Sequence, residues 1–409
     1  MARKLQADKW LFAATAGLAL FGIVMVYSAS AVMAEAENGN QYYYVIKQGI
    51  WTAIGFGAML SMMQFDYQRL RDRRVVYGLL ALTTILLLGV FAFPRINGAH
   101  RWIRFAGFSV QPSELSKLAL AIFLAYLLEK RAGEEGSLKR TFIPCMAVTA
   151  LMAALVLKEP DFGTGLMLAV ICIVMYYTAG ARLLHLAMAA APGLAIGVGM
   201  LLFVPWRLQR LVTFTDPWAD PQNKGFQVVQ SLIAIGSGGT SGLGFAQGKQ
   251  KMFFLPFAHS DFIFAVIGEE LGLFGALMVV AVFGLLLWRG LRAALRAPDR
   301  FGMLLGIGIV TGIVVQALFN ISVVLSLLPT KGIPLPFISY GGSSLVPTLI
   351  AVGILLNISQ RSASGAGTSE QWLDAETRGR GDAATEKHDS AASSSFSTRL
   401  RVPASPRRG

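Results

Sequence analysis

GSGGTSGLGFAQGKQKMFFLPFAHSDFIFAVIGEELG, residues 236–272, joins a glycine-rich, basic loop to an apolar helix, and one carboxylate, Asp261, lies at the junction. Apolar helices of about 20 residues cross a bilayer, so we expect this junction to lie where water meets membrane. Most of the remaining chain is compatible with hydrocarbon. A reactive centre would therefore have to be built from the few polar side chains at such borders.

The composition identifies the broad class of protein. Of 409 residues, 54% are hydrophobic and only 14% are charged, which lies well outside the balance of soluble domains. Cys145 and Cys172 both lie inside apolar segments, so no disulfide framework is predicted. The first apolar run exceeds a signal-peptide core and lacks a convincing cleavage site, which indicates a retained first helix. The sequence predicts a polytopic membrane protein.

Ten apolar runs are long enough to cross a bilayer, which takes about 20 residues. They lie near residues 10–33, 43–64, 75–94, 113–129, 141–157, 162–179, 184–205, 262–288, 301–325 and 343–360. We expect an all-α fold with ten transmembrane helices in a membrane domain over 10–360, after a short N-terminus, 1–9. The stretch 206–261 is predicted to be a large extracytoplasmic loop between the seventh and eighth helices, with a short amphipathic helix at 226–235.

The distribution of Lys and Arg predicts the orientation. Alternate loops carry Arg3, Lys4 and Lys9; Arg69, Arg71, Arg73 and Arg74; Lys130, Arg131, Lys139 and Arg140; Arg182; and Arg289, Arg292, Arg296 and Arg300. By the positive-inside rule these loops and both termini are cytoplasmic. The net charge of +13 therefore reflects topology rather than nucleic-acid binding. The polar tail, 361–409, is predicted to be disordered and cytoplasmic.

The predicted outer side carries cations that topology does not explain. Arg101, Arg104 and Lys117 follow the third helix, and Lys251 lies in the long loop. Such cations suit an anionic head group carried on a lipid, because Arg and Lys donate charge-assisted hydrogen bonds to phosphate oxygens. The alternative is that the two arginines pair with Glu114 or with lipid phosphates and merely fix depth.

Other polar residues lie where predicted helices break. In the short connection 158–161, Asp161 is expected to cap a helix. The stretch 331–343 contains two prolines and three glycines between apolar runs, which predicts irregular backbone that lines protein or a wet cavity. Glu269 and Glu270 lie about two turns into the eighth helix, and at least one of them is expected to pair with a neighbouring helix.

Common catalytic and nucleotide-binding motifs do not fit. A P-loop fails at Leu243 and Gln250, and the dinucleotide pattern fails at Gln247, so no nucleotide or flavin is predicted. The adjacent residues 259–261 cannot form a hydrolase triad. With four His and two buried Cys, a zinc site is not expected either.

Several longer motifs together resemble one family. GAHRWI (98–103), QPSELSK (111–117), EPDFGT (159–164), QSLIAIGSGG (230–239), AHSDFIFAVIGEELG (258–272) and PLPFISYGGSS (334–344) occur in this order. The chain thereby resembles the SEDS proteins of bacterial envelope synthesis, over about residues 8–358. EPDFGT and DPWAD (216–220) favour the cell-division branch over the elongation branch.

The resemblance implies a function and a setting. It implies a ten-helix peptidoglycan glycosyltransferase that polymerises lipid II at the outer face of the cytoplasmic membrane, at the division septum. It also implies a class B penicillin-binding protein as partner, together with other divisome membrane proteins. The essential acid of the family's H-(T/S)-D-F motif falls on Asp261, with Ser260 where Thr is more common.

The chemistry of sugar transfer agrees with these residue types. A sugar hydroxyl is a poor nucleophile, so a positioned carboxylate must accept its proton, and we expect Asp261 to be this base. A departing lipid diphosphate needs neutralisation by cations, or by a divalent ion such as Mg²⁺ or Mn²⁺. The substrate-binding candidates are Arg101, Arg104, Lys117, Lys251, Lys331 and Ser343. Glu114 is expected to bind substrate together with them by supporting the cations. The alternative for Asp261 is a cap of the eighth helix.

Two other functions remain open at this point. A ten-helix bundle with interior charges and broken helices would suit a lipid II flippase, but a flippase needs a polar path reaching both faces, and the unexplained charges gather on one. A non-catalytic scaffold would recruit the transpeptidase through glycine-rich helix faces, which do not distinguish an active subunit from a passive one.

Overall fold

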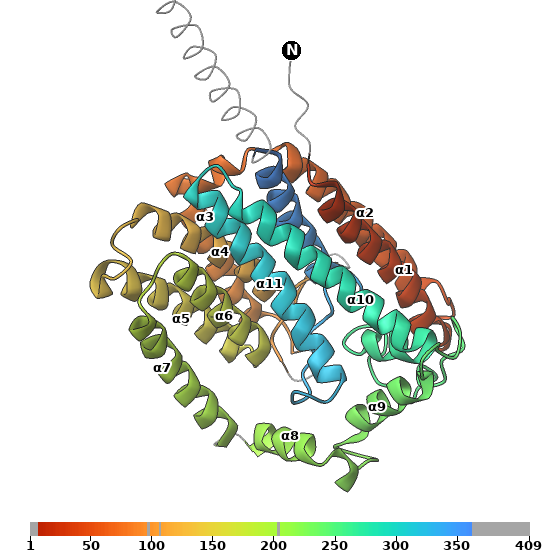
Figure 1. Cartoon of the computed structure of the whole chain (residues 1–409). Helices are drawn as coiled ribbons and strands as arrows, with labels where there is room; N and C mark the ends of the chain where they lie inside the picture. The colour runs from red at the N-terminus through yellow and green to blue at the C-terminus, as the bar shows by residue number, and fades with distance from the viewer. Residues whose placement is uncertain (1–6, 96–98, 106–107, 203–204, 362–409) are drawn as a thin grey trace, which may run out of the picture.

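The computed structural model describes residues 7–95, 99–105, 108–202 and 205–361 (Figure 1). The predicted disordered tail lies outside the described residues. The long helices, in chain order, are α1 (Lys9–Asn38), α2 (Tyr43–Gln64), α3 (Arg73–Gly89), α4 (Pro112–Lys130), α5 (Ile143–Lys158), α6 (Phe162–Thr178), α7 (Leu183–Leu202), α8 (Pro205–Thr215), α9 (Phe226–Gly238), α10 (Ile263–Leu295), α11 (Arg300–Val324) and a last helix, Gly342–Arg361. Short helical turns are η1 (Tyr67–Arg71), η2 (Val90–Ala92), η3 (Leu138–Phe142) and η4 (Pro217–Ala219), and the strands β1 (Ile103–Phe105) and β2 (Phe108–Val110) form an antiparallel hairpin.

Aspartates fix where several helices begin. Asp8, Asp72, Asp161 and Asp299 are the N-caps of α1, α3, α6 and α11, and each accepts a hydrogen bond from a backbone N–H of the first turn. Such caps satisfy amides that have no partner inside the helix. The expected capping role of Asp161 is thus confirmed. At its other end α1 runs five residues past the predicted run and stops at Gly39, whose left-handed backbone suits glycine.

Six described helices are long and apolar enough to cross a membrane: α1, α3 with η2, η3 with α5, α10, α11 and the last helix. Helix α4 carries Glu114, Lys117, Glu129 and Lys130 within 19 residues, which is more charge than a lipid-facing span usually has. The chain is a multi-pass membrane protein. The count of ten spans stays a prediction.

Helix α11 is central to the bundle. It packs against α4, α6 and α10, and it is buried along most of its length, as is the last helix. Figure 1 shows α11 between α10 and the α5–α6 pair, with α7, α8 and α9 along one edge. The connection from α7 to α10 contains α9, which matches the predicted amphipathic helix, and α8, which the sequence analysis did not predict.

Candidate functional site

The 331–341 segment is irregular backbone buried inside the bundle, as predicted. Its apolar side chains Ile333, Leu335, Phe337 and Ile338 are buried. Amide side chains from neighbouring helices satisfy its carbonyls: Asn320 Nδ2 donates to Ile333 O at 2.7 Å, Gln316 Nε2 to Pro334 O at 3.0 Å and Gln48 Nε2 to Ser339 O at 3.3 Å. Protein groups thus replace the water that is missing at this depth.

The backbone around Asp261 is fastened to this segment. Asn320 Nδ2 donates to Asp261 O at 2.8 Å, and Ser339 Oγ donates to Ser260 O at 2.6 Å. The backbone N–H of Tyr340 donates to His259 O at 3.0 Å. These bonds use main-chain oxygens, so the position of Asp261 is fixed without occupying its carboxylate.

The Asp261 carboxylate does not cap a helix. Helix α10 begins at Ile263, and its N-cap, Phe262, makes no side-chain capping bond. The capping alternative for Asp261 is therefore wrong. The carboxylate accepts a hydrogen bond from Ser260 Oγ at 3.0 Å, and a Cβ on Gly332 would lie 2.5 Å from its Oδ2. Burial raises the pKa of Asp261, against the opposing effects of Ser260 and Arg101.

Lys331, the neighbour of Gly332, forms an ion pair with Asp161. Its Nζ lies 3.2 Å from Asp161 Oδ1 and has no hydrogen-bond partner among the described residues. Burial lowers the pKa of Lys331 to about 8, although Asp161 opposes the shift. Burial acts to raise the pKa of Asp161, but Lys331 and Arg101 outweigh it and hold the pKa below its ordinary range. The ammonium of Lys331 is therefore buried, with Asp161 as its ion-pair partner and with no hydrogen bond to another described residue.

Two arginines complete this site. Arg101 donates from Nη2 to Pro160 O at 2.6 Å and from Nε to Glu159 O at 3.2 Å, and Arg210 donates from Nη1 to Thr330 O at 3.2 Å. Both arginines lie close enough to Lys331 to lower its pKa. We call Asp261, Lys331, Asp161, Arg101 and Arg210 the Asp261 cluster. Its members come from five separate parts of the chain.

A buried carboxyl lies behind Arg101. Glu159 is fully buried, and neither of its carboxyl oxygens has a hydrogen-bond partner among the described residues. Burial raises the pKa of Glu159 to about 8, helped by Asp161 and opposed by Arg101. With Glu159 neutral near pH 7, the Asp261 cluster holds three cations and two carboxylates and has a net positive charge.

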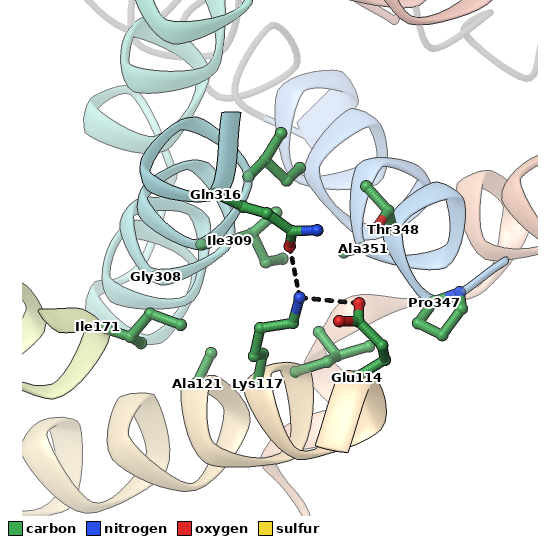
Figure 2. A pocket seen from close by; sticks show the side chains of 13 residues that line it. Glu114, Lys117, Ala121, Ile171, Gly308, Ile309, Gln316, Pro347, Thr348 and Ala351 are labelled. Atoms are coloured by element: carbon green, nitrogen blue, oxygen red, sulfur yellow. Dashed lines mark hydrogen bonds and ion pairs between the residues drawn. The ribbon is translucent and has the colours of Figure 1, made fainter. Parts of the chain in front are cut away.

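Two predicted residues, Glu114 and Lys117, line a separate cavity between α4, α6, α11 and the last helix (Figure 2). Lys117 Nζ donates to Glu114 Oε2 at 2.8 Å and to Gln316 Oε1 at 2.5 Å. Glu114 thus supports a cation, but that cation is Lys117 and not Arg101 or Arg104. Since Gln316 also donates to Pro334 O, it connects this cavity to the 331–341 segment.

The remaining predicted residues lie elsewhere. Arg104 is exposed on β1, and Ser343 is buried in the first turn of the last helix. Lys251 is buried and donates to Glu270 Oε1 at 2.6 Å and Ser28 Oγ at 2.9 Å, so its ammonium is already engaged. The pairing of Glu270 with α1, through Ser28, agrees with the expectation for the two glutamates.

Sequence reasoning missed two members of the Asp261 cluster as site residues. Asp161 was expected only as a cap, and Arg210 was not among the substrate-binding candidates. Their position in predicted outer connections was the one available signal. Among the described residues, no three His, Cys, Asp or Glu side chains gather closely enough to hold a metal ion.

Comparisons with known proteins agree with this architecture. The family model of the cell cycle proteins FtsW, RodA and SpoVE matches residues 9–364. A protein of Geobacter metallireducens named "Probable peptidoglycan glycosyltransferase FtsW" is 46% identical over 348 residues, 84% of this chain and 92% of that protein. Stage V sporulation protein E of Bacillus subtilis is 41% identical over 364 residues, 88% of this chain and 99% of that protein.

Solved structures extend the likeness to three dimensions. A chain from a study titled "Structural coordination of polymerization and crosslinking by a peptidoglycan synthase complex" matches with a TM-score of 0.72 and 29% identity, over 87% of this chain and 98% of that one. The rod shape determining protein RodA of Thermus thermophilus matches with a TM-score of 0.65 and 26% identity, over 87% and 98%. The chain belongs to the FtsW/RodA/SpoVE family of cell cycle proteins.

Proposed function

We propose that this protein is a peptidoglycan glycosyltransferase that polymerises lipid II at the outer face of the bacterial cytoplasmic membrane. The names of its relatives support the activity. The observation that carries the proposal is the Asp261 cluster, in which one partly exposed carboxylate lies in a group of side chains that contains three cations. This combination suits a reaction that needs one base and a diphosphate leaving group.

Asp261 acts as the general base. A hydroxyl oxygen of the acceptor sugar attacks the anomeric carbon of the donor sugar and forms the new glycosidic bond, while the bond from that carbon to the lipid diphosphate breaks. The hydroxyl proton passes to the Asp261 carboxylate, and the electron pair of the broken bond leaves with the diphosphate. The raised pKa of Asp261 makes it a stronger base than an exposed aspartate. Attack opposite the leaving group inverts the anomeric centre.

The cations stabilise the leaving group. Lys331 and the two arginines present ammonium and guanidinium donors to the diphosphate oxygens, whose negative charge grows in the transition state. Asp161 holds Lys331 in place and is neutralised by it. The net positive charge of the Asp261 cluster favours a dianionic ligand over a neutral sugar.

A divalent cation such as Mg²⁺ would fit here only with help from the substrate. Asp161 and Asp261 interact electrostatically, but two carboxylates make an incomplete ligand set. Magnesium sites of this kind take their other ligands from substrate phosphates and water. Such an ion would add Lewis-acid neutralisation of the diphosphate to that of the cations.

The proposed topology follows from the distribution of Lys and Arg, and the proposed location and partners follow from the family. We place ten spans in residues 10–360, both termini in the cytoplasm and the Asp261 cluster outside, at the division septum. A class B penicillin-binding protein is the proposed partner, because a structural relative comes from a complex that couples polymerization to crosslinking. Other divisome membrane proteins would join the same assembly.

The test is reconstitution of the chain with its cognate transpeptidase in liposomes that contain labelled lipid II. Glycan strands that resist inhibitors of the other polymerase class would support the proposal. Movement of lipid II between leaflets without strand formation would instead identify a flippase. Neither strands nor movement, in a complex whose transpeptidase is active, would favour a non-catalytic scaffold.

A further inference from the structure

The loop that precedes Asp261 turns aromatic rings outward, and of its two lysines Lys249 is exposed and Lys251 is buried. Phe253 is 63% exposed and Phe254 is 53% exposed, whereas Lys251 is only 6% exposed. Phe245 and Phe257 are also exposed. We call residues 243–257 the aromatic loop. A loop in water normally turns its aromatic rings inward, so this row of exposed phenylalanines indicates an apolar surrounding.

The backbone of the aromatic loop is joined to a break in α10. Gly272 has φ 66° and ψ −163°, which interrupts the helix and frees backbone groups on both sides. Leu243 N donates to Glu269 O and Gly244 N to Glu270 O, both at 3.0 Å, while Leu273 N donates to Gly239 O at 3.0 Å. The loop therefore lies at the same depth as residues 269–273 of α10.

Two buried carboxylates accept hydrogen bonds from three further loop amides. Glu269 Oε1 accepts from Lys249 N at 2.7 Å and from Gln250 N at 3.2 Å, and Glu270 Oε2 accepts from Ala246 N at 3.1 Å. A loop in water would leave these amides to solvent. Placing two carboxylates under it is what irregular backbone needs where water is scarce.

Two cross-links between α1 and α10 measure that depth. At one end Arg289 Nη2 lies 2.5 Å from Asp8 Oδ2, and at the other Ser28 Oγ donates to Glu270 Oε1 at 2.7 Å. About 20 residues of the uninterrupted helix α1 separate the cross-links, which is about 30 Å at the helical rise. The hydrocarbon layer is about 30 Å thick.

The first cross-link lies at a membrane surface. The exposed Trp10 and Trp288 stand beside Lys9 and Arg289, an arrangement typical of an interfacial belt. The Ser28–Glu270 cross-link therefore lies at the opposite boundary of the hydrocarbon layer, and the aromatic loop with it. Exposed aromatic rings are favoured at this boundary.

We infer that the aromatic loop is inserted into the lipid leaflet at the Asp261 end of the bundle, with its phenylalanine rings among acyl chains. Under the orientation proposed above this is the outer leaflet. The inserted loop ends four residues before Asp261, so the membrane surface lies directly beside the proposed base. A substrate carried on a lipid would then reach the Asp261 cluster without leaving the leaflet.

Collision-accessibility measurements on spin labels test this inference in the full-length chain, reconstituted in phosphatidylethanolamine–phosphatidylglycerol liposomes. Cys145 and Cys172 are 0% and 1% exposed, so the unmodified protein serves as the labelling blank. Nitroxides are attached at Phe253→Cys and, as a second site, at Phe254→Cys. Lys224→Cys, on an exposed residue of the long connection, is the aqueous control.

We expect both loop labels to collide several-fold more often with oxygen, relative to a water-soluble nickel complex, than the control label does. Equal ratios at the loop and control sites would overturn the inference, because the loop would then be in water. Labels that neither reagent reaches would also overturn it, because protein would then cover the loop. The readout does not depend on catalysis, so it can fail while the proposed function stands, and the reverse.

Discussion

Lys331 Nζ lies 3.2 Å from Asp161 Oδ1, and the next residue of the chain, Gly332, lies against the carboxylate of Asp261. Two consecutive residues of irregular backbone thus provide the cation that pairs with Asp161 and the glycine that contacts the proposed base. Asp161 accepts hydrogen bonds from Thr164 in the first turn of α6, so the cation is positioned by the N-terminus of that helix. The geometry of the site therefore depends on the packing of the 331–341 segment against Asp161 and Asp261.

Replacing Lys331 by Met should abolish polymerisation and also destabilise the protein. The change leaves Asp161 buried without its ion-pair partner, which typically costs about 3–5 kcal/mol. Thermal unfolding in detergent should show a lowered transition. Adding Asp161→Asn, which keeps the cap of α6, should restore most of the stability but not the activity. Recovery of activity in the double variant would contradict a direct role for Lys331.

Gly332→Ala should lower the turnover rate with little loss of stability. The new Cβ would come 2.5 Å from Asp261 Oδ2, so the carboxylate must move away from its position. A misplacement of about 1 Å at a reacting group can cost about 100-fold in rate. The matched control is Gly236→Ala on α9, where an added Cβ meets nothing within 4 Å. Equal rates in the two variants would show that the position of Asp261 is not critical.

The rate of polymerisation should fall as the pH rises above about 8. Burial lowers the pKa of Lys331 to about 8 and raises that of Glu159 to about 8, so both lose a proton in this range. Deprotonation of Lys331 removes a positive charge from the surroundings of the diphosphate, and deprotonation of Glu159 adds a negative one. Lys331→Arg keeps its charge at these pH values, and Glu159→Gln cannot ionise. Each variant should make the decline shallower, and an unchanged pH profile in both would contradict the assignment.

Glu269→Ala should loosen the aromatic loop. The carboxylate accepts hydrogen bonds from the backbone N–H groups of Lys249 and Gln250, and the loop has no other support at these two amides among the described contacts. Hydrogen–deuterium exchange should become faster over residues 246–252. Exchange in α11 should be unchanged, which separates local loosening from global unfolding. Exchange that becomes equally faster in residues 246–252 and in α11, or that changes in neither, would contradict this role.

The sequence predicted those features that depend on local pattern. Apolar runs of sufficient length became helices close to the expected positions, and the two prolines and three glycines of 331–343 predicted the irregular segment. Asp161 as a helix cap follows from its place before an apolar run. Asp261, Arg101 and Lys331 were selected by residue type, position and resemblance, and the structure brings them together.

The features that the sequence did not predict depend on contacts between distant residues. Lys331 and Asp161 pair across 170 positions of sequence, and Lys251 pairs with Glu270 and Ser28 instead of facing the site. No local pattern distinguishes a buried, engaged lysine from one that faces a ligand. Helix α8 was missed because its sequence mixes arginines with apolar residues and lacks a long apolar run.

The central claim is that the Asp261 carboxylate removes the proton of the attacking sugar hydroxyl. Asp261→Asn keeps the size and the ability to accept from Ser260, and since Asp261 caps no helix, the fold should be unaffected. The direct measurement is strand synthesis from labelled lipid II by this variant, purified with its transpeptidase partner and compared with the unmodified complex. The account predicts intact folding and partner binding with no detectable strands. Strand synthesis near the unmodified rate would contradict it.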